Sequence, residues 1–325
     1  KEKKFCINKL MMKFKKIKKN LNGAIYTIFT PFRKNLEIDY KGLEKYLDFL
    51  YNSGARVFYA MPYNSRYSQL REKEIFQLNK FCIKKINSYS NALSIVSDSI
   101  HGSTSFKKEL CLSAKENGCK VFASICREKY FTDEQIYMHY QELNKCNIGI
   151  IVHVMPFLSG YNSNNFNWPL SIFKKLSKLN NLIGIKEDTK NVNYGRKMIN
   201  KFGKRFKIIF AGQKKYFIKL NPDRNFSYLN SSSIIDPRID EIFINLIEKG
   251  DRKNLIKFVK YIDDYFWNNL CNKYGWHRVN KASIEAIGYF KRYERLPMVH
   301  LTSKEQSNLK EKISILQKRL EKIII

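Results

Sequence analysis

The residue that most directly suggests chemistry is Lys186, which ends the apolar run Leu182–Lys186 and is followed by Glu187, Asp188 and Thr189. A lysine amine is usually protonated, with a pKa of ~10.4, and it attacks a ketone only when neutral. Poor hydration at the end of a barrel strand disfavours the ammonium and lowers this pKa. Taken alone, the pattern favours a simpler alternative, a strand-end lysine whose ammonium extends to water. The rest of the chain reverses that preference.

The elements that would position this lysine are short β-branched or aromatic runs, which alternate with longer helical patterns from Gly23 onward. The predicted strands are Ala24–Thr30, Arg56–Met61, Ala92–Ser97, Lys120–Ile125, Gly149–His153, Leu182–Lys186, Lys207–Ala211 and Phe226–Asn230. The predicted helices between them are Asp39–Ser53, Arg71–Ser90, Ser103–Asn117, Asp133–Lys145, Pro169–Leu179, Val192–Phe202 and Lys214–Leu220. This alternation predicts an α/β protein, a (β/α)8 TIM barrel with parallel strands.

The chain divides into three predicted parts. Residues 1–22 form a basic tail that we expect to be disordered, and residues 23–250 form the barrel. Residues 251–325 form a C-terminal helical extension, with helical patterns over Lys253–Tyr274, Val279–Phe290 and Ser303–Lys322. We expect a capping box at the helix that follows Thr132, because Gln135 stands three residues later.

In a barrel of this kind the chemistry lies at the C-terminal ends of the strands. The side chains predicted to meet there include a lysine, a histidine, hydroxyls and an amide: Thr30, Tyr63, Asn64, Asp98, Arg127, Glu128, His153, Lys186, Gln213 and Ser231. Imine chemistry uses groups of these kinds.

Composition excludes several other classes of protein. Lys and Arg outnumber Asp and Glu by 60 to 29, which gives a formal charge of +31, but the lysines are spread over every predicted helix. We attribute the excess to an AT-rich genome and expect no specific nucleic-acid partner. No apolar run reaches the ~18–20 residues of a membrane span. The seven cysteines are scattered without C-x-x-C spacing, which argues against disulfides and zinc and favours a cytoplasmic location.

Several motifs together resemble the dihydrodipicolinate synthase / N-acetylneuraminate lyase family of class I aldolases, over roughly Gly23 to Leu320. The quoted matches are Thr30-Pro31-Phe32 with Ile38-Asp39, Gly102-Ser103-Thr104, Gly184-Ile185-Lys186-Glu187-Asp188-Thr189 and Arg295-Leu296-Pro297-Met298. Leu158-Ser159-Gly160 resembles the lyase branch of the family. The resemblance implies a pyruvate-like 2-keto acid bound as an imine to Lys186, no metal or organic cofactor, and a homotetramer or homodimer.

The chain departs from the family at the position of the proton shuttle and in the loop that binds the substrate carboxylate. The family places a tyrosine in Y-N-x-P at the end of the fifth strand, whereas this chain has His153. Histidine moves protons near neutrality, so His153 is either the proton shuttle or a buried spectator. In the family, the loop G-T-T-G-E binds the carboxylate of the keto acid, and the corresponding residues here are Pro62–Arg66. Tyr63 could supply the missing phenol.

We therefore expect a Schiff-base lyase or aldolase that condenses or cleaves a keto acid or keto-sugar acid. The expected catalytic residues are Lys186, His153 and Tyr63, and the expected substrate-binding residues are Thr30, Asn64, Ser65, Ser159, Gly160 and Gln213. The alternative is a catalytically inactive barrel that acts as a binding or regulatory protein, which the rewritten loops motivate.

Overall fold

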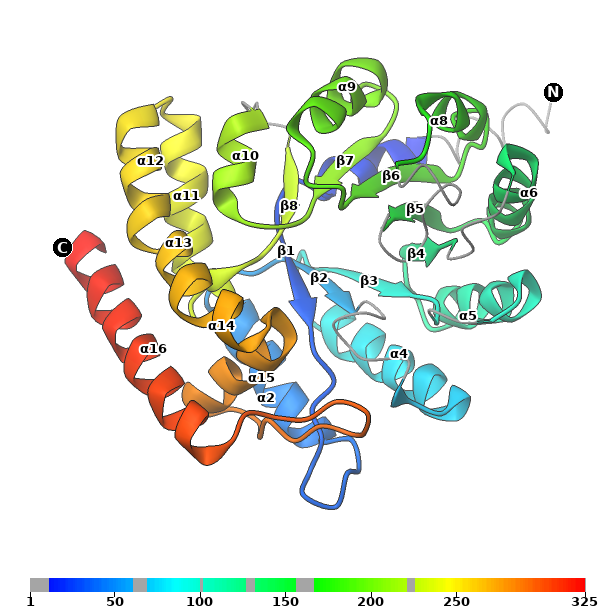
Figure 1. Cartoon of the computed structure of the whole chain (residues 1–325). Helices are drawn as coiled ribbons and strands as arrows, with labels where there is room; N and C mark the ends of the chain where they lie inside the picture. The colour runs from blue at the N-terminus through cyan, green and yellow to red at the C-terminus, as the bar shows by residue number, and fades with distance from the viewer. Residues whose placement is uncertain are drawn as a thin grey trace.

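Eight parallel strands close into a barrel in sequence order (Figure 1). The computed structural model describes residues 12–60, 69–99, 102–126, 132–155, 167–220 and 226–324. The strands are β1 (Gly23–Ile28), β2 (Val57–Ala60), β3 (Leu93–Ser97), β4 (Val121–Ile125), β5 (Gly149–Val154), β6 (Leu182–Glu187), β7 (Lys207–Phe210) and β8 (Ser227–Leu229). The predicted TIM barrel is confirmed.

Helices follow the strands and surround the barrel (Figure 1). They are α2 (Tyr40–Asn52), α4 (Glu72–Asn87), α5 (Thr104–Glu116), α6 (Asp133–Asn144), α8 (Leu170–Leu176), α9 (Val192–Phe202), α10 (Lys214–Leu220) and α11 (Arg238–Glu248), with the short 3-10 turn η2 (Ser232–Ile234) after β8. The predicted capping box is present at α6. Gln135 N–H donates to Thr132 Oγ1 at 3.2 Å, and Thr132 N–H donates to Gln135 Oε1 at 2.8 Å.

The C-terminal extension packs on the side of the barrel formed by α10 and α11 (Figure 1). Its elements are α12 (Arg252–Tyr261), α13 (Asp263–Phe266), the π-helical turn η3 (Trp267–Cys271), α14 (Asn272–Tyr274), α15 (Trp276–Ala286) and α16 (Ser303–Ile324). The helical run predicted over Lys253–Tyr274 is thus interrupted at Ile262 and widened at η3. Gly275, with φ of 85°, ends it in the left-handed region and starts α15 in a new direction.

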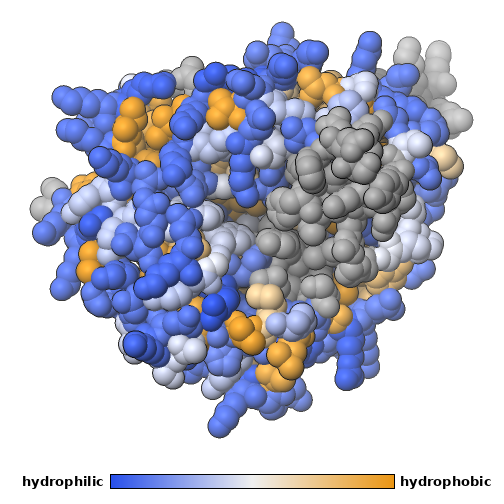
Figure 2. All heavy atoms as spheres, in the orientation of Figure 1, coloured by the Kyte–Doolittle hydropathy of each residue, from blue (hydrophilic) through white to orange (hydrophobic). Residues whose placement is uncertain are grey.

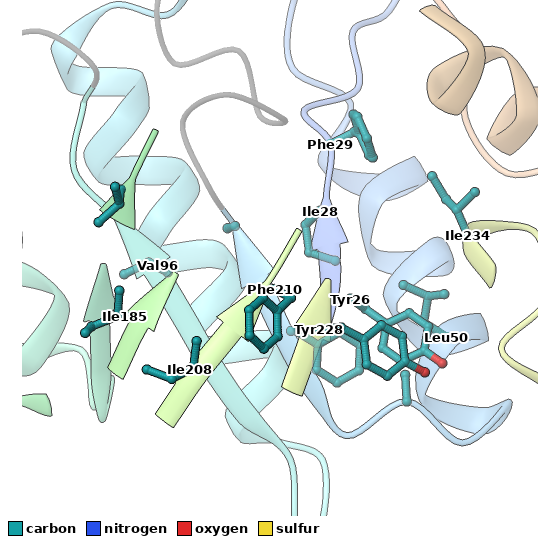
Figure 3. Packing of buried hydrophobic residues seen from close by; sticks show 14 of the residues in the cluster. Tyr26, Ile28, Phe29, Leu50, Val96, Ile185, Ile208, Phe210, Tyr228 and Ile234 are labelled. Carbon is teal, nitrogen blue, oxygen red and sulfur yellow. The ribbon is translucent and has the colours of Figure 1, made fainter. Parts of the chain in front are cut away.

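Apolar side chains form two buried clusters, as the alternation along each strand requires. The larger cluster lies between the strands and the surrounding helices, and Figure 3 shows part of it, including Tyr26, Phe210 and Tyr228. The smaller cluster fills the inside of the barrel and includes Tyr59 and Ile151. Hydrophilic residues predominate on the face shown in Figure 2. None of the described helices is long and apolar enough to span a membrane.

The described part of the predicted tail is ordered, which differs from our expectation of disorder. Residues 12–20 are helical. Phe14, Ile17 and Leu21 are buried in the cluster inside the barrel, while Lys16 on the opposite side is exposed. The sequence analysis considered the basic composition of this segment and missed its apolar face, in which apolar residues recur every three to four residues, the period of a helix.

This helix should contribute to stability through its apolar face. We expect Ile17→Ala to lower the free energy of unfolding by about 2–5 kcal/mol, because it leaves a cavity in a packed cluster. The matched control, Lys16→Ala, should change it by no more than about 0.5 kcal/mol. Urea unfolding measures both. Equal effects of the two substitutions would contradict this role of the helix.

Candidate active site

Lys186 points into the barrel from β6 and is fully buried. Its neighbour across the sheet is His153 on β5, since the two residues pair in the parallel register. Lys186 Nζ lies 2.6 Å from His153 Nε2 and donates to Asp188 Oδ2 at 2.9 Å. The structure therefore brings together the predicted imine-forming lysine and the predicted shuttle.

The sequence around Lys186 fits this position closely. A Cβ atom on Gly184 would lie 3.1 Å from the carbonyl oxygen of Lys207 and 3.4 Å from Ile151 Cγ1, so a larger residue would push the neighbouring strands apart. Alternation along the strand turns Glu187 away from Lys186. Its carboxylate instead accepts hydrogen bonds from the Tyr216 hydroxyl at 3.0 Å and from Thr189 N–H at 2.6 Å.

Burial shifts the protonation equilibrium of Lys186 toward the neutral amine. Burial lowers the pKa of Lys186 below its ordinary value, and the negative charge of Asp188 opposes this shift. Burial and the nearby charge of Lys186 hold the pKa of His153 well below its usual range, so its imidazole is neutral. When Lys186 is protonated its ammonium has no lone pair, so His153 Nε2 accepts from it and the ring proton resides on Nδ1.

A cavity of about 370 Å³ opens beside Lys186. The described residues that line it come from the ends of β6, β7 and β8 and from the C-terminal extension: Lys186, Asp188, Lys190, Ala211, Gly212, Leu229, Asn230, Trp267, Gly275, Trp276, His277, Arg278 and Met298. A volume of this size is typical of small-molecule sites. Within the described ranges, no cluster of His, Cys, Asp and Glu has the arrangement of a metal site.

The other predicted site residues divide into two groups. Thr30 is buried just after β1, and Gln213 is half-buried just before α10. Neither is among the described residues that line the cavity. The remaining predicted residues, Tyr63, Asn64, Ser65, Ser159 and Gly160, lie outside the described part of the chain.

The sequence analysis missed the contribution of the C-terminal extension. Trp267, Trp276 and Met298 line the cavity although they are far from any strand end in the sequence. The sequence signal that points to them is Gly275, which breaks a long helical pattern immediately before Trp276. The carboxylate of Asp188 was also not assigned to the site, although it is two residues from Lys186 and so returns to the same side of the strand.

These features define a barrel with a buried lysine beside a cavity at the C-terminal ends of its strands. Residues 20–316 match the dihydrodipicolinate synthetase family. Because this match spans most of the chain, the protein belongs to that family.

Curated relatives and solved structures agree with this assignment. A 4-hydroxy-tetrahydrodipicolinate synthase of Karelsulcia muelleri is 24% identical over 290 residues, which cover 86% of this chain and 93% of the relative. A DapA-like lyase of Pyrococcus abyssi is 24% identical over 204 residues, 61% of this chain and 65% of the relative.

Among solved structures, the 4-hydroxy-tetrahydrodipicolinate synthase of Methylacidiphilum fumariolicum SolV has a TM-score of 0.79 at 18% identity, covering 93% of this chain and 98% of that one. A prophage protein of the dihydrodipicolinic acid synthase family from E. coli K12, solved in complex with pyruvate, has a TM-score of 0.78 at 17% identity, covering 91% and 98%. At such identities these likenesses establish the fold.

The charges around Lys186 predict opposite pH shifts in two variants. Imine formation needs the neutral amine, so the rate of reductive trapping of pyruvate with cyanoborohydride should rise with pH through the pKa of Lys186 and then level off. Asp188→Asn removes a charge that raises this pKa, so the midpoint should move to lower pH. Lys190→Ala removes a charge that lowers it, so the midpoint should move to higher pH. Shifts in the same direction for both variants would refute this electrostatic picture.

Proposed function

We propose that the protein is a class I lyase or aldolase in which Lys186 forms an imine with a pyruvate-like 2-keto acid. The observation that carries this proposal is the environment of Lys186 Nζ, which is buried, lies at a cavity and contacts both His153 and Asp188. Family membership supports it, because curated relatives are named as synthases and lyases. The pyruvate complex of the E. coli prophage protein shows that a structurally similar barrel accepts this keto acid.

The reaction begins with the neutral amine of Lys186, which attacks the ketone carbon of the substrate. The carbonyl oxygen takes up a proton, Nζ loses one, and the resulting carbinolamine expels water to leave an iminium. His153 Nε2 is within 2.6 Å of Nζ and is the acceptor of the Nζ proton. Because the pKa of His153 is held low, its protonated form is a strong acid that passes the proton on to the departing hydroxyl.

The iminium then draws electrons from the adjacent carbon–carbon bond. In the cleavage direction the bond between C3 and C4 breaks, its electron pair forms an enamine, and the C4 hydroxyl proton goes to a base. Protonation of the enamine at C3 and hydrolysis by water release the keto acid and restore the amine. The carboxylate of Asp188 stabilises the positive charge of the iminium at a distance of 2.9 Å from Nζ. Because the imine itself accepts the electrons, we propose that the reaction needs no metal or organic cofactor.

Lys186→Ala tests the imine directly. The wild-type protein treated with pyruvate and borohydride should gain a pyruvate-sized mass on the peptide that contains Lys186, and the variant should gain none. Lys215→Ala is the matched control, because Lys215 is an exposed lysine on α10, and it should be trapped like the wild type. Intact-mass and peptide mass spectrometry measure the adduct. A wild-type protein without any adduct would instead favour a barrel that only binds ligands.

The variant His153→Asn tests the proposed proton shuttle while it leaves the proposed nucleophile, Lys186, in place. We expect turnover to fall by roughly 10²–10⁴-fold, which is the usual contribution of a positioned acid–base group. Trapping of the keto acid on Lys186 at the end point should persist, because the amine is still present. The control is His300→Asn, since His300 is exposed on a loop. Undiminished turnover in His153→Asn would assign the histidine a spectator role.

A further inference from the structure

The C-terminal extension forms one wall of the described cavity, with Trp267, Trp276 and Met298 among its residues. On the basis of the imine chemistry proposed above, we infer that this wall binds the second reactant, and that this reactant is an aldehyde with a flat, apolar body, such as an aromatic aldehyde. The enamine carbon C3 of the keto acid attacks the aldehyde carbon. The aldehyde oxygen takes up a proton, and hydrolysis of the imine releases a 4-hydroxy-2-keto acid with an apolar substituent.

The cavity, at about 370 Å³, has room for more than the keto acid. Pyruvate alone fills a minor part of this space. The remainder extends from Lys186 toward α15 and the loop that carries Met298.

Two indoles give this outer space its shape. Trp267 and Trp276 are two of the three tryptophans of the chain, and both line the cavity. Trp267 Nε1 donates to Ser231 Oγ at 2.7 Å, which fixes the indole to the end of β8. Trp276 packs against Phe29 with ring centroids 5.7 Å apart. Rings held in this way present preformed flat surfaces, on which an aromatic ring packs at little entropic cost.

The rest of the described lining contains both apolar and polar side chains, and besides Lys186 and Asp188 the polar ones are Lys190, Asn230, His277 and Arg278. Ala211, Leu229 and Met298 are apolar, and Gly212 adds no side chain. Asn230 Oδ1 already accepts hydrogen bonds from Thr27 N–H and from Thr27 Oγ1, both at 2.9 Å. Against the apolar part of this lining, a polyhydroxylated aldehyde would lose hydrogen bonds to water without replacing them, and each unpaired hydroxyl weakens binding.

One nitrogen of the Arg278 guanidinium is engaged within the protein. Arg278 donates to Glu305 at 3.1 Å and to the carbonyl oxygen of His300 at 3.3 Å. Trp276 Nε1 is buried and makes no hydrogen bond to a described residue. The indole rings and the apolar side chains beside them suit an apolar body better than a sugar chain.

The decisive experiment measures binding without imine formation. In Lys186→Ala, isothermal titration calorimetry compares 4-phenyl-2-oxobutanoate with a polyhydroxylated 2-keto acid such as 2-keto-3-deoxygluconate. We expect the aromatic ligand to bind at least tenfold more tightly. Adding Trp276→Ala should remove most of this advantage. Tyr261→Ala, which removes a partly exposed aromatic ring of α12 that does not line the described cavity, should retain it.

Three outcomes decide between the possibilities. Equal binding of the two ligands, or tighter binding of the polyhydroxylated one, would overturn the inference. If Trp276→Ala fails to fold, Met298→Ala replaces it, because Met298 lies on a loop, and an undiminished preference in that variant would also overturn the inference. Borohydride trapping of pyruvate in the wild type reports on the imine separately, so a failure of the proposed reaction remains distinguishable from a failure of this subsite.

Discussion

The structure of the site depends on the removal of one lysine amine from water. Transfer of an ammonium into a protein interior costs several kcal/mol even after relaxation, so burial lowers the pKa of Lys186 and shifts the equilibrium toward its neutral amine. The carboxylate of Asp188 offsets part of this cost and prevents the shift from being larger. The closed sheet makes the arrangement possible, because its hydrogen bonds keep the strands rigid while Gly184 allows close approach of the neighbouring strands.

Burial next to an acid does not by itself make a lysine reactive. Lys107, Lys214 and Lys281 are also buried, and each lies within 3.4 Å of a carboxylate: Asp98, Asp240 and Glu294, respectively. None of these lysines lines the described cavity. Lys107 and Lys281 also donate to carbonyl oxygens, of Ile125 and Tyr293, which leaves these ammonium groups in structural networks. Lys186 differs because an open volume adjoins it and its second partner is a neutral imidazole.

The sequence was sufficient to predict those elements whose signal lies within a few neighbouring residues. The strands were predictable because parallel strands buried on both faces appear as short apolar runs, and the α6 capping box was predictable because it is defined by Thr132 and Gln135 alone. Because both residues lie at C-terminal strand ends, the sequence also predicted that Lys186 and His153 would be close together, and in the structure they are in contact. The predicted roles of these two residues remain predictions.

The features that the sequence did not reveal depend on contacts between distant segments. Residues 12–20 were interpreted as a tail because lysines dominate them, although Ile17 finds its partners inside the barrel. Trp276 was not recognised because its place at the cavity depends on Gly275 and on the widened turn η3, which change the direction of the chain. The side chains predicted on the loops after β2 and β5 lie outside the described residues, and their assignment stays as the sequence analysis made it.

The position of the C-terminal extension has an evolutionary consequence. The barrel supplies Lys186, His153 and Asp188, whereas the extension supplies Trp267, Trp276 and Met298, so strand ends and helices from distant parts of the chain meet at one cavity. Mutations in the extension can change its side of this cavity while the sequence of the strands that hold the lysine is kept. A gene with this division can diverge in what its cavity binds while the strands that hold Lys186 are retained.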